Sequence, residues 1–519
     1  MRIPFPERVS LPGVAIFAGM LFVVQQWEGT AMYFSGGCVA FILIAAVAFN
    51  VGGGLTRAAG AYIFFYSLLI VIIGVTYKAY LGEPGQSNLL DPRTDILVYD
   101  AGITGMLIAA FLSRSLRRKK PLLGDLISDA TLYRASVGCI AFGIVGDSAI
   151  ELLGEAGLRL VTAFVQLNWL VPLGMILGVI YEIRSSGGRK SVNVPVLVGG
   201  AYLFGFYGIL NFSKQGMLTP LLCWLLPVCA LRYRLSVGQI IGAGVGGFLV
   251  FYLFVPYSQY GRRYAMPGQT IADKFNISLN LLSDPVELRK NYQQDPGPPG
   301  YYNTAQGFWD RLQFVSVDDG LVNVTDEGKV FGLSPIAITF ANAIPHVLWP
   351  NKPVMNFGNM YAHEIGNMNP EDFSTGISFS PTAEAYHMLK WMGLLVVGPA
   401  LWLMLFAVFD NVLGDLRATP WGLLTLALLS HTAPEGGLTG TIWMVTFGLE
   451  IVVFCAFFAK WAAPHLAVAF VGPTKTDKLP RVVESIPLRS MSRRTPSAVS
   501  SGAPVRLSRS RASGVADSG

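Results

Sequence analysis

Charged residues are scarce in this sequence. Asp, Glu, Lys and Arg make up 13% of the 519 residues, whereas hydrophobic residues make up 52% and the mean hydropathy is +0.49. A soluble globular domain carries about 25% charged residues. The composition therefore excludes an ordinary water-soluble protein and favours one that is embedded in a membrane.

Cysteine is also rare. Only five cysteines occur, and each falls within an apolar stretch of the chain. Because none has a paired-loop context, we expect buried thiols rather than disulfides or metal ligands. The five are Cys38, Cys139, Cys223, Cys229 and Cys455.

What the chain has in abundance is apolar windows. A helix needs about 20 mostly apolar residues to cross roughly 30 Å of hydrocarbon, and on this basis we place about twelve spans. The fifth window contains Asp147, and the eleventh is short and ends near His431 and Glu435. The windows lie at residues 11–27, 31–51, 58–80, 96–113, 133–150, 157–182, 192–211, 217–231, 236–256, 391–411, 420–434 and 439–461.

Basic residues fall in alternate loops and predict the orientation. They precede the first window or follow even-numbered ones, whereas the opposite loops are short or acidic. Because Lys and Arg are enriched in cytoplasmic loops, both termini are expected in the cytoplasm. The basic residues are Arg2, Arg8, Arg114, Arg117, Arg118, Lys119, Lys120, Arg184, Arg189, Lys190, Arg232, Arg234, Arg417 and Lys460.

This orientation divides the chain into four parts. Residues 1–256 form the first nine transmembrane helices, 257–390 one large outer loop, and 391–464 the last three helices. Residues 465–519 are rich in Ser, Arg and Pro and predict a disordered basic cytoplasmic tail. The tail is expected to lie near anionic headgroups, with a regulatory role as the alternative. The predicted fold class is all-α: a polytopic membrane protein whose outer loop forms short helices.

Three cations lie close to the predicted outer surface. Arg262 and Arg263 follow the ninth window and stand beside tyrosines, and Lys214 lies in Asn-Phe-Ser-Lys-Gln-Gly between the seventh and eighth. Arginine offers a planar, bidentate fork that suits a phosphate or diphosphate group. The alternatives are an interfacial anchor for the arginines and a snorkelling side chain for the lysine.

Two further segments of the outer loop carry candidate residues. Arg311 lies in Gly-Phe-Trp-Asp-Arg-Leu-Gln-Phe, where the apolar spacing predicts an amphipathic helix. The run Ile-Pro-His-Val-Leu-Trp-Pro-Asn-Lys-Pro (344–353) ends a predicted apolar helix over 336–344. Its prolines present His346, Trp349 and Lys352 at defined angles, with the indole as a face for a sugar ring and the other two as donors to diphosphate oxygens.

A carboxylate follows about thirty residues later. Glu384 lies in Ser-Pro-Thr-Ala-Glu-Ala-Tyr (380–386), at the start of a helix that leads into the tenth span, with Tyr386 close behind. Glu384 is a candidate general base, or the counter-ion that orients a basic residue. The alternative is complementation of the helix N-terminus.

The order of these segments resembles one protein family. Phe-Ser-Lys-Gln-Gly before a span, a Trp-x-Arg segment, Pro-x-x-Leu-Trp-Pro-x-Lys-Pro and the Glu-Ala-Tyr segment before a span are similar to bacterial O-antigen and exopolysaccharide repeat-unit polymerases of the Wzy type. The motifs cover residues 211–393, whereas the earlier spans match in hydropathy alone. One departure concerns His346, where related sequences commonly carry arginine; histidine can be neutral near pH 7, which weakens the comparison there.

The resemblance implies a glycosyl transfer at the periplasmic face of the bacterial inner membrane. A glycan on undecaprenyl diphosphate would move to an incoming lipid-linked repeat unit, with membrane lipid around it and a chain-length regulator and a flippase of the same pathway as partners. No cofactor, metal or nucleic acid is expected. Predicted catalytic residues are Glu384, Arg311 and Lys352; predicted substrate-binding residues are Lys214, Arg262, Arg263, His346, Trp349 and Tyr386.

Three other functions share parts of this pattern. A ligase of lipid-linked oligosaccharides differs only in its acceptor. A multi-span glycosyltransferase of another type normally has a catalytic acid in its first outer loop, but here that loop is residues 27–30, with Glu28 as its one acid. A transporter or flippase would carry its charge within the spans. The pairs His363–Glu364 and His431–Glu435 are interpreted as packing or hydrogen-bonding groups rather than metal ligands.

Overall fold

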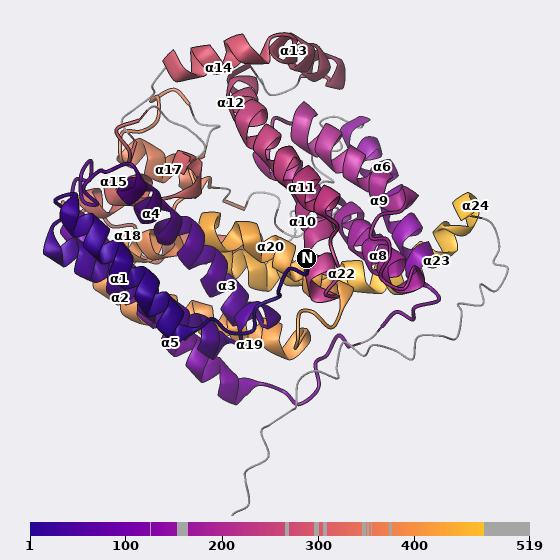
Figure 1. Ribbon diagram of the computed structural model, residues 1–519, viewed down its shortest axis with the longest axis horizontal. Coiled ribbons are helices and arrows are strands. Elements are labelled where there is room, and N and C mark those ends of the chain that lie inside the picture. Colours follow the sequence, from indigo (N-terminus) through magenta and orange to yellow (C-terminus); the bar gives the residue numbers. More distant parts are fainter. Residues whose placement is uncertain are drawn as a thin grey trace, which may run out of the picture.

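The structure is a bundle of helices. The computed structural model describes residues 1–124, 126–152, 165–264, 269–294, 300–304, 309–344, 349, 352–353, 355–372 and 376–471, and every named element in them is a helix (Figure 1). All five cysteines are free and buried, as predicted. The all-helical fold class is therefore confirmed at this level.

Nearly every predicted span contains a helix at its expected place. Seven helical segments are long and apolar enough to cross a membrane, so the chain is a candidate polytopic membrane protein; the number twelve stays a prediction. The seven are Met32–Gly52, Ala58–Tyr80, Pro92–Leu116, Leu167–Ser185, Val237–Arg262, Pro381–Val412 and Thr439–Trp461. Shorter apolar helices are Leu11–Trp27 and Val194–Leu210.

The first half of the chain supplies most of these helices. They are α1 (Leu11–Trp27), α2 (Met32–Gly52), α3 (Ala58–Ser67), α4 (Ile73–Tyr80), α5 (Pro92–Ser113), α6 (Leu132–Leu152), α8 (Leu170–Ser185), α9 (Val194–Tyr202), α10 (Lys214–Ala230), α11 (Val237–Leu249) and α12 (Val255–Tyr264).

The predicted outer loop and the C-terminal part add shorter elements. They are α13 (Ile271–Ser283), α14 (Pro285–Gln294), η7 (Trp309–Leu312), α15 (Val315–Asp326), α16 (Ser334–Asn342), α17 (Phe357–Glu364), α18 (Pro381–Met392), α19 (Gly398–Val412), α20 (Pro420–Glu435), α21 (Thr439–Trp443), α22 (Leu449–Trp461), α23 (Ala463–Leu466) and α24 (Val468–Val471). The predicted helix over 336–344 corresponds to α16. The tail beyond 471 lies outside the described residues.

A repeated sequence signal begins several helices. A Ser, Thr, Asp or Asn side chain accepts a hydrogen bond from the first turn, and a proline follows at once or one residue later. Asp91 does this for α5, Ser380 for α18 and Thr419 for α20. The capped starts place Glu384 in the first turn of α18 and so determine which way it points.

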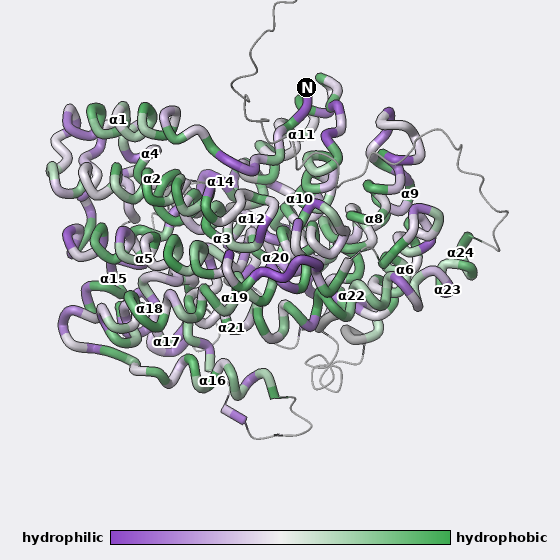
Figure 2. The backbone as a smooth tube through the Cα atoms, turned by 90° about the horizontal axis from the view of Figure 1, so that it is seen from below, coloured by the Kyte–Doolittle hydropathy of each residue, from purple (hydrophilic) through white to green (hydrophobic). Residues whose placement is uncertain are grey.

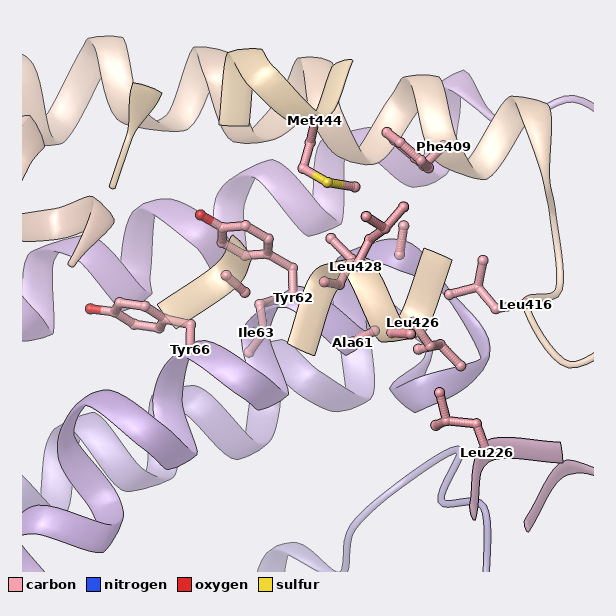
Figure 3. Packing of buried hydrophobic residues seen from close by; sticks show 14 of the residues in the cluster. Ala61, Tyr62, Ile63, Tyr66, Leu226, Phe409, Leu416, Leu426, Leu428 and Met444 are labelled. Atoms are coloured by element: carbon pink, nitrogen blue, oxygen red, sulfur yellow. The ribbon is translucent and has the colours of Figure 1, made fainter. Parts of the chain in front are cut away.

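Helix α20 lies at the centre of the bundle and contacts α3, α8, α10 and α22. Figure 3 shows Leu426 and Leu428 of α20 beside Ala61 and Ile63 of α3. Small residues at the start of α3 allow this close approach, and nearly the whole of α20 is buried. A helix that is apolar on all sides needs such a central position. Its C-terminal end therefore delivers His431 and Glu435 to a defined place.

The basic loops meet at one end of the bundle. Arg117 pairs with Asp410 (Nε to Oδ2, 2.7 Å), Arg417 pairs with Glu7 (2.5 Å), and the Met1 amino group donates to the Leu235 carbonyl (2.8 Å). Four segments that were predicted to share one side of the membrane are therefore in mutual contact. That this side is the cytoplasm stays a prediction.

The helices α15 to α18 gather on one side of the bundle (Figure 2). They are attached to α5 by aspartates of α15. Asp318 accepts hydrogen bonds from the Tyr99 hydroxyl (2.8 Å) and from the backbone N–H of Ser380 (2.9 Å). Asp319 accepts from the N–H groups of Leu90 and Asp91. The predicted loop thus forms short helices, as expected, and those of this group are docked on the bundle.

One boundary differs from the prediction. The helix of the ninth window does not end at 256 but continues to Tyr264, because Tyr257 is buried against Phe212 and its hydroxyl donates to Ile209 and Ser278. Helix α18 begins at Pro381, so Glu384 lies at the start of a helix that leads into the tenth window, as predicted. Non-helical dihedrals at Leu389 and Lys390 interrupt this helix. The kink separates the segment that holds Glu384 from the apolar helix that follows it.

Burial of Asp318 predicts a pH-dependent stability. Burial raises its pKa from 3.8 to about 6, so the folded protein binds a proton more tightly than the unfolded chain. The stabilisation is complete below pH 3.8 and is lost as the pH rises through 6. We expect thermal unfolding in detergent to show a loss of about 1 kcal/mol between pH 5 and pH 7 from this group.

The matched variant is Asp318→Asn, which should flatten the dependence on pH. The control is Glu287→Gln, which removes an exposed carboxylate from α14 and should leave the slope unchanged. An equal slope in wild type and Asp318→Asn would contradict the assignment.

Candidate functional site

The carboxylate of Glu384 is buried and fully engaged. Glu384 lies in the first turn of α18 and is 1% exposed. The Tyr361 hydroxyl donates to Oε1 (3.0 Å), and the Thr439 backbone N–H donates to Oε2 (2.9 Å). The Thr439 hydroxyl lies 3.1 and 3.2 Å from the two oxygens. Glu384 therefore ties α17 and the start of α21 to α18.

A glycine turn lies directly against this carboxylate. Gly437 has φ +62, and a Cβ built on it would lie 2.2 Å from Oε2 of Glu384. Only glycine combines this backbone conformation with such a close approach. The turn between α20 and α21 is thus held in position by Glu384, and this turn follows Glu435 immediately in the chain.

The donor from α17 is kept in its protonated form. Burial, with the nearby carboxylate of Glu384 as a further cause, raises the pKa of Tyr361. The hydroxyl therefore remains a donor over the physiological range. Tyr361 is therefore a constant donor to the Glu384 side chain.

A histidine and a glutamate lie at the end of α20, just before the Gly437 turn. His431 and Glu435 are one helical turn apart at the end of α20, with Nδ1 of the imidazole 3.2 Å from Oε2 of the carboxylate. Their side chains are 40% and 42% exposed. This pair is therefore accessible, unlike Glu384.

Two cations from distant segments act on the same carboxylate. Lys214, the first residue of α10, and Arg262, in the last turns of α12, both lie close enough to interact with the charge of Glu435. The guanidinium Nε of Arg262 donates to the Phe212 carbonyl (3.2 Å). Gly261 makes this possible, since a Cβ there would lie 1.9 Å from the Phe212 ring. We call Lys214, Arg262, His431 and Glu435 the charged cluster.

A further lysine borders the charged cluster. Lys274 of α13 donates through Nζ to the side-chain oxygen of Asn211 (3.1 Å), three residues before Lys214. Helices α10, α12, α13 and α20 thus bring basic groups and one acid to the same region. Fixed cations around an exposed face suit an anionic ligand that carries several oxygens.

Other predicted site residues lie elsewhere. The Lys352 ammonium donates to the carbonyls of Asn342 (2.8 Å) and Ile344 (2.7 Å) and so caps the end of α16, and partial burial lowers its pKa. Tyr386 donates its hydroxyl to Asp326 (2.6 Å), and Trp349 is exposed. No contact joins these three to the charged cluster within the described residues. Helix α16 does contact α21, which begins at Thr439.

Three predicted residues cannot be placed by their side chains. Arg263 lies on α12 and Arg311 on η7, a single turn of 3₁₀ helix rather than the longer amphipathic helix predicted, but their side chains lie outside the described residues. His346 lies outside them altogether. Their assigned roles remain predictions.

The sequence assigned the His431–Glu435 pair to packing or hydrogen bonding, and the structure shows the two side chains in contact at the exposed end of α20. The signal was present: a histidine and a glutamate spaced i, i+4 lie on one face at a helix end. What the sequence does not carry is that α10 and α12 deliver cations to this end. Among the described residues no group of three His, Cys, Asp or Glu side chains is placed to hold a metal ion.

Two cavities lie away from the charged cluster. One cavity is lined by Arg184, Arg417 and Trp421 and a second by Arg189 and Arg234, both at the basic end of the bundle. The candidate site is instead defined by converging charge and by the buried carboxylate behind it.

No protein-family model, no curated protein and no solved structure matches this chain. A function for this chain therefore rests on the contacts of its own residues.

Proposed function

We propose that the chain is a membrane glycosyltransferase that polymerises lipid-linked oligosaccharide repeat units at the outer face of the bacterial inner membrane. The observation that carries the proposal is that helix α10 packs against α20 and that the charges of Lys214 and Arg262 both act on Glu435 at the end of α20. Both residues belong to motifs that predict a phosphate-binding role, and they lie 48 positions apart in the chain. Their meeting beside an accessible His–Glu pair supports a site for an anionic substrate.

The cations suit the leaving group of this reaction. As the bond between the anomeric carbon and the diphosphate breaks, negative charge accumulates on the diphosphate oxygens. Lys214 and Arg262 are anchored in helices, so they need little reorganisation to meet that charge. Cations positioned for developing charge stabilise the transition state more than the ground state.

His431 suits the role of general base. The carboxylate of Glu435 lies at Nδ1, which favours a proton on that nitrogen and leaves Nε2 as the acceptor. Nε2 would take the proton of the acceptor hydroxyl as its oxygen bonds to the anomeric carbon. The bonding electrons of the broken bond leave with the polyprenyl diphosphate, so atoms and charge balance without a co-reactant.

Glu384 is better suited to positioning than to proton transfer. Its oxygens are occupied by Tyr361 and Thr439, and its burial separates it from an acceptor hydroxyl. It holds the Gly437 turn and so determines where α20 ends. This proposal moves the base from Glu384 to His431 and keeps Glu384 as the residue that supports it.

A gel profile of lipid-linked and surface glycans from a strain that lacks the gene tests the proposal. Loss of the long ladder, with a single repeat unit still transferred to the final acceptor, is the expected result. Accumulation of long lipid-linked chains with no transfer would indicate a ligase instead. An unchanged profile would exclude both and favour a transporter.

A further inference from the structure

Three aromatic rings lie nearly parallel at the end of α4. The Tyr77 ring lies 4.8 Å from the Trp309 ring and 6.0 Å from the Tyr80 ring, each with an interplanar angle of 22°. Tyr80 is 82% exposed and Trp309 is 39% exposed. The rings come from segments more than two hundred residues apart, so the fold, not local sequence, assembles them. We call Tyr77, Tyr80 and Trp309 the ring stack.

The ring stack rests on a rigid support. The Tyr302 ring meets Tyr77 edge-on (5.1 Å, 88°), and its hydroxyl donates to the Gly74 carbonyl (3.1 Å). The Tyr301 hydroxyl donates to the Gly85 carbonyl (2.7 Å). These bonds connect residues 301 and 302 to α4 and to the segment after it. The middle ring of the stack is therefore fixed in orientation.

A buried lysine adds to this support. The Lys78 ammonium is fully buried, donates to the carbonyls of Ser87 and Tyr301, and lies 3.8 Å from the centroid of the Tyr301 ring. A buried ammonium is costly unless it is bonded in this way. Lys78 thus fixes the backbone at Ser87 and Tyr301, next to the ring stack. A surface that only contacts lipid does not need such a support.

Amide groups lie beside the support. The Asn88 side-chain nitrogen donates to Oδ1 of Asn303 (2.9 Å), and the Asn303 backbone N–H donates to the carboxylate of Glu83 (3.1 Å). Asn303 is exposed. Asn303 follows Tyr302, whose ring contacts Tyr77, so an exposed apolar ring face and hydrogen-bonding amides belong to the same part of the surface.

We propose that the ring stack binds a neutral sugar ring of the growing glycan. The axial C–H groups of a pyranose carry partial positive charge and lie against the negative face of an aromatic ring, while its hydroxyls need polar partners. The identity of this glycan as the polymer under synthesis rests on the proposed function. The ability to bind a sugar rests on the ring geometry alone. The ring stack would hold the chain during extension and so affect its final length.

An interfacial aromatic belt is the competing explanation, because Tyr and Trp also gather at membrane surfaces. A belt residue needs neither a parallel neighbour nor a rigid support. Trp27 provides the comparison: it is 86% exposed at the end of α1, and the adjoining Gly29 and Ala31 are hydrogen-bonded to Gln86, next to the segment that Lys78 holds. Trp27 is thus an exposed aromatic side chain at the same end of the bundle.

Binding is tested with the purified full-length protein in detergent. The probe is a fluorescently labelled oligosaccharide of two repeat units, released by partial acid hydrolysis from the polysaccharide of the producing cell. Fluorescence anisotropy gives the dissociation constant without turnover. We expect Tyr80→Ala and Trp309→Ala each to raise it about tenfold, which corresponds to a loss of about 1.4 kcal/mol of binding free energy at about 25 °C. Tyr80→Phe keeps the ring and should stay within about twofold of wild type.

The outcomes separate the two proposals. No binding by wild type, or equal binding by wild type, Tyr80→Ala and Trp309→Ala, overturns the sugar site. A comparable loss in Trp27→Ala also overturns it, because the effect would then belong to aromatic surface in general. If the ring-stack variants lose binding while the gene deletion leaves the glycan profile unchanged, the sugar site stands and the polymerase assignment fails. In the producing cell, the ring-stack variants should give a shorter ladder rather than none.

Discussion

Replacement of Arg262 by alanine is expected to lower the rate of glycan extension by about 100- to 1000-fold, the range found when one preorganised donor to a developing charge is removed. Arg262 is exposed, its charge acts on Glu435, and it is oriented by its bond to the Phe212 carbonyl. The rate would be measured with purified protein and a lipid-linked repeat unit as both donor and acceptor. The Michaelis constant should change less than the rate, because the charge develops only as the bond breaks.

Two variants control this measurement. Arg262→Lys keeps the charge but loses the planar fork, so we expect an intermediate rate. Arg289→Ala removes an arginine of α14 whose guanidinium lies over the Tyr252 ring at 3.6 Å and donates to the Tyr252 carbonyl, outside the charged cluster. It should extend glycans like wild type. If Arg262→Ala and Arg289→Ala lower the rate equally, the effect is a general one on helices α12 to α14, and a specific role for Arg262 is contradicted.

The helices were predictable because the sequence signals that specify them are local. Apolar windows of span length, capping residues and prolines are all read within a few turns, and they locate α1, α2 and α5 to within a few residues of the structure. The extension of α12 was not predictable, because it depends on contacts between Tyr257 and a turn 45 residues earlier. Tertiary contacts of this kind override the local signal.

The candidate site was predictable only in part. Residue chemistry selected Lys214, Arg262 and Glu384, but it could not say that the first two meet at the end of α20 or that Glu384 is buried behind a glycine turn. For Lys352, the structure shows contacts other than the ligand contact that residue chemistry predicted. Its charge suggested a diphosphate ligand, whereas its ammonium is bonded to carbonyls at the end of α16. Charge type indicates what a residue can bind, and only packing shows what it does bind within its own chain.

The second large effect is expected at His431, the proposed general base, which Glu384 supports by positioning the end of α20. His431→Gln should reduce extension by about 100- to 10,000-fold, the contribution of a general base, with little change in thermal stability because the imidazole is 40% exposed. Glu435→Gln removes the group that orients the imidazole, so its rate should also fall, and the dependence of the remaining rate on pH should shift. Both variants should insert and fold like wild type.

Glu384→Gln should behave differently, because its effect begins with the fold. A glutamine amide placed against the Thr439 N–H sets one donor against another inside a buried site. An unsatisfied buried group costs about 1–3 kcal/mol, so the melting temperature should fall together with the rate. Tyr361→Phe removes one donor to the same carboxylate and should lower stability in the same direction. If Glu384→Gln instead keeps the melting temperature of wild type and abolishes extension, while His431→Gln remains active, then Glu384 is the base and its burial must be relieved when substrate binds.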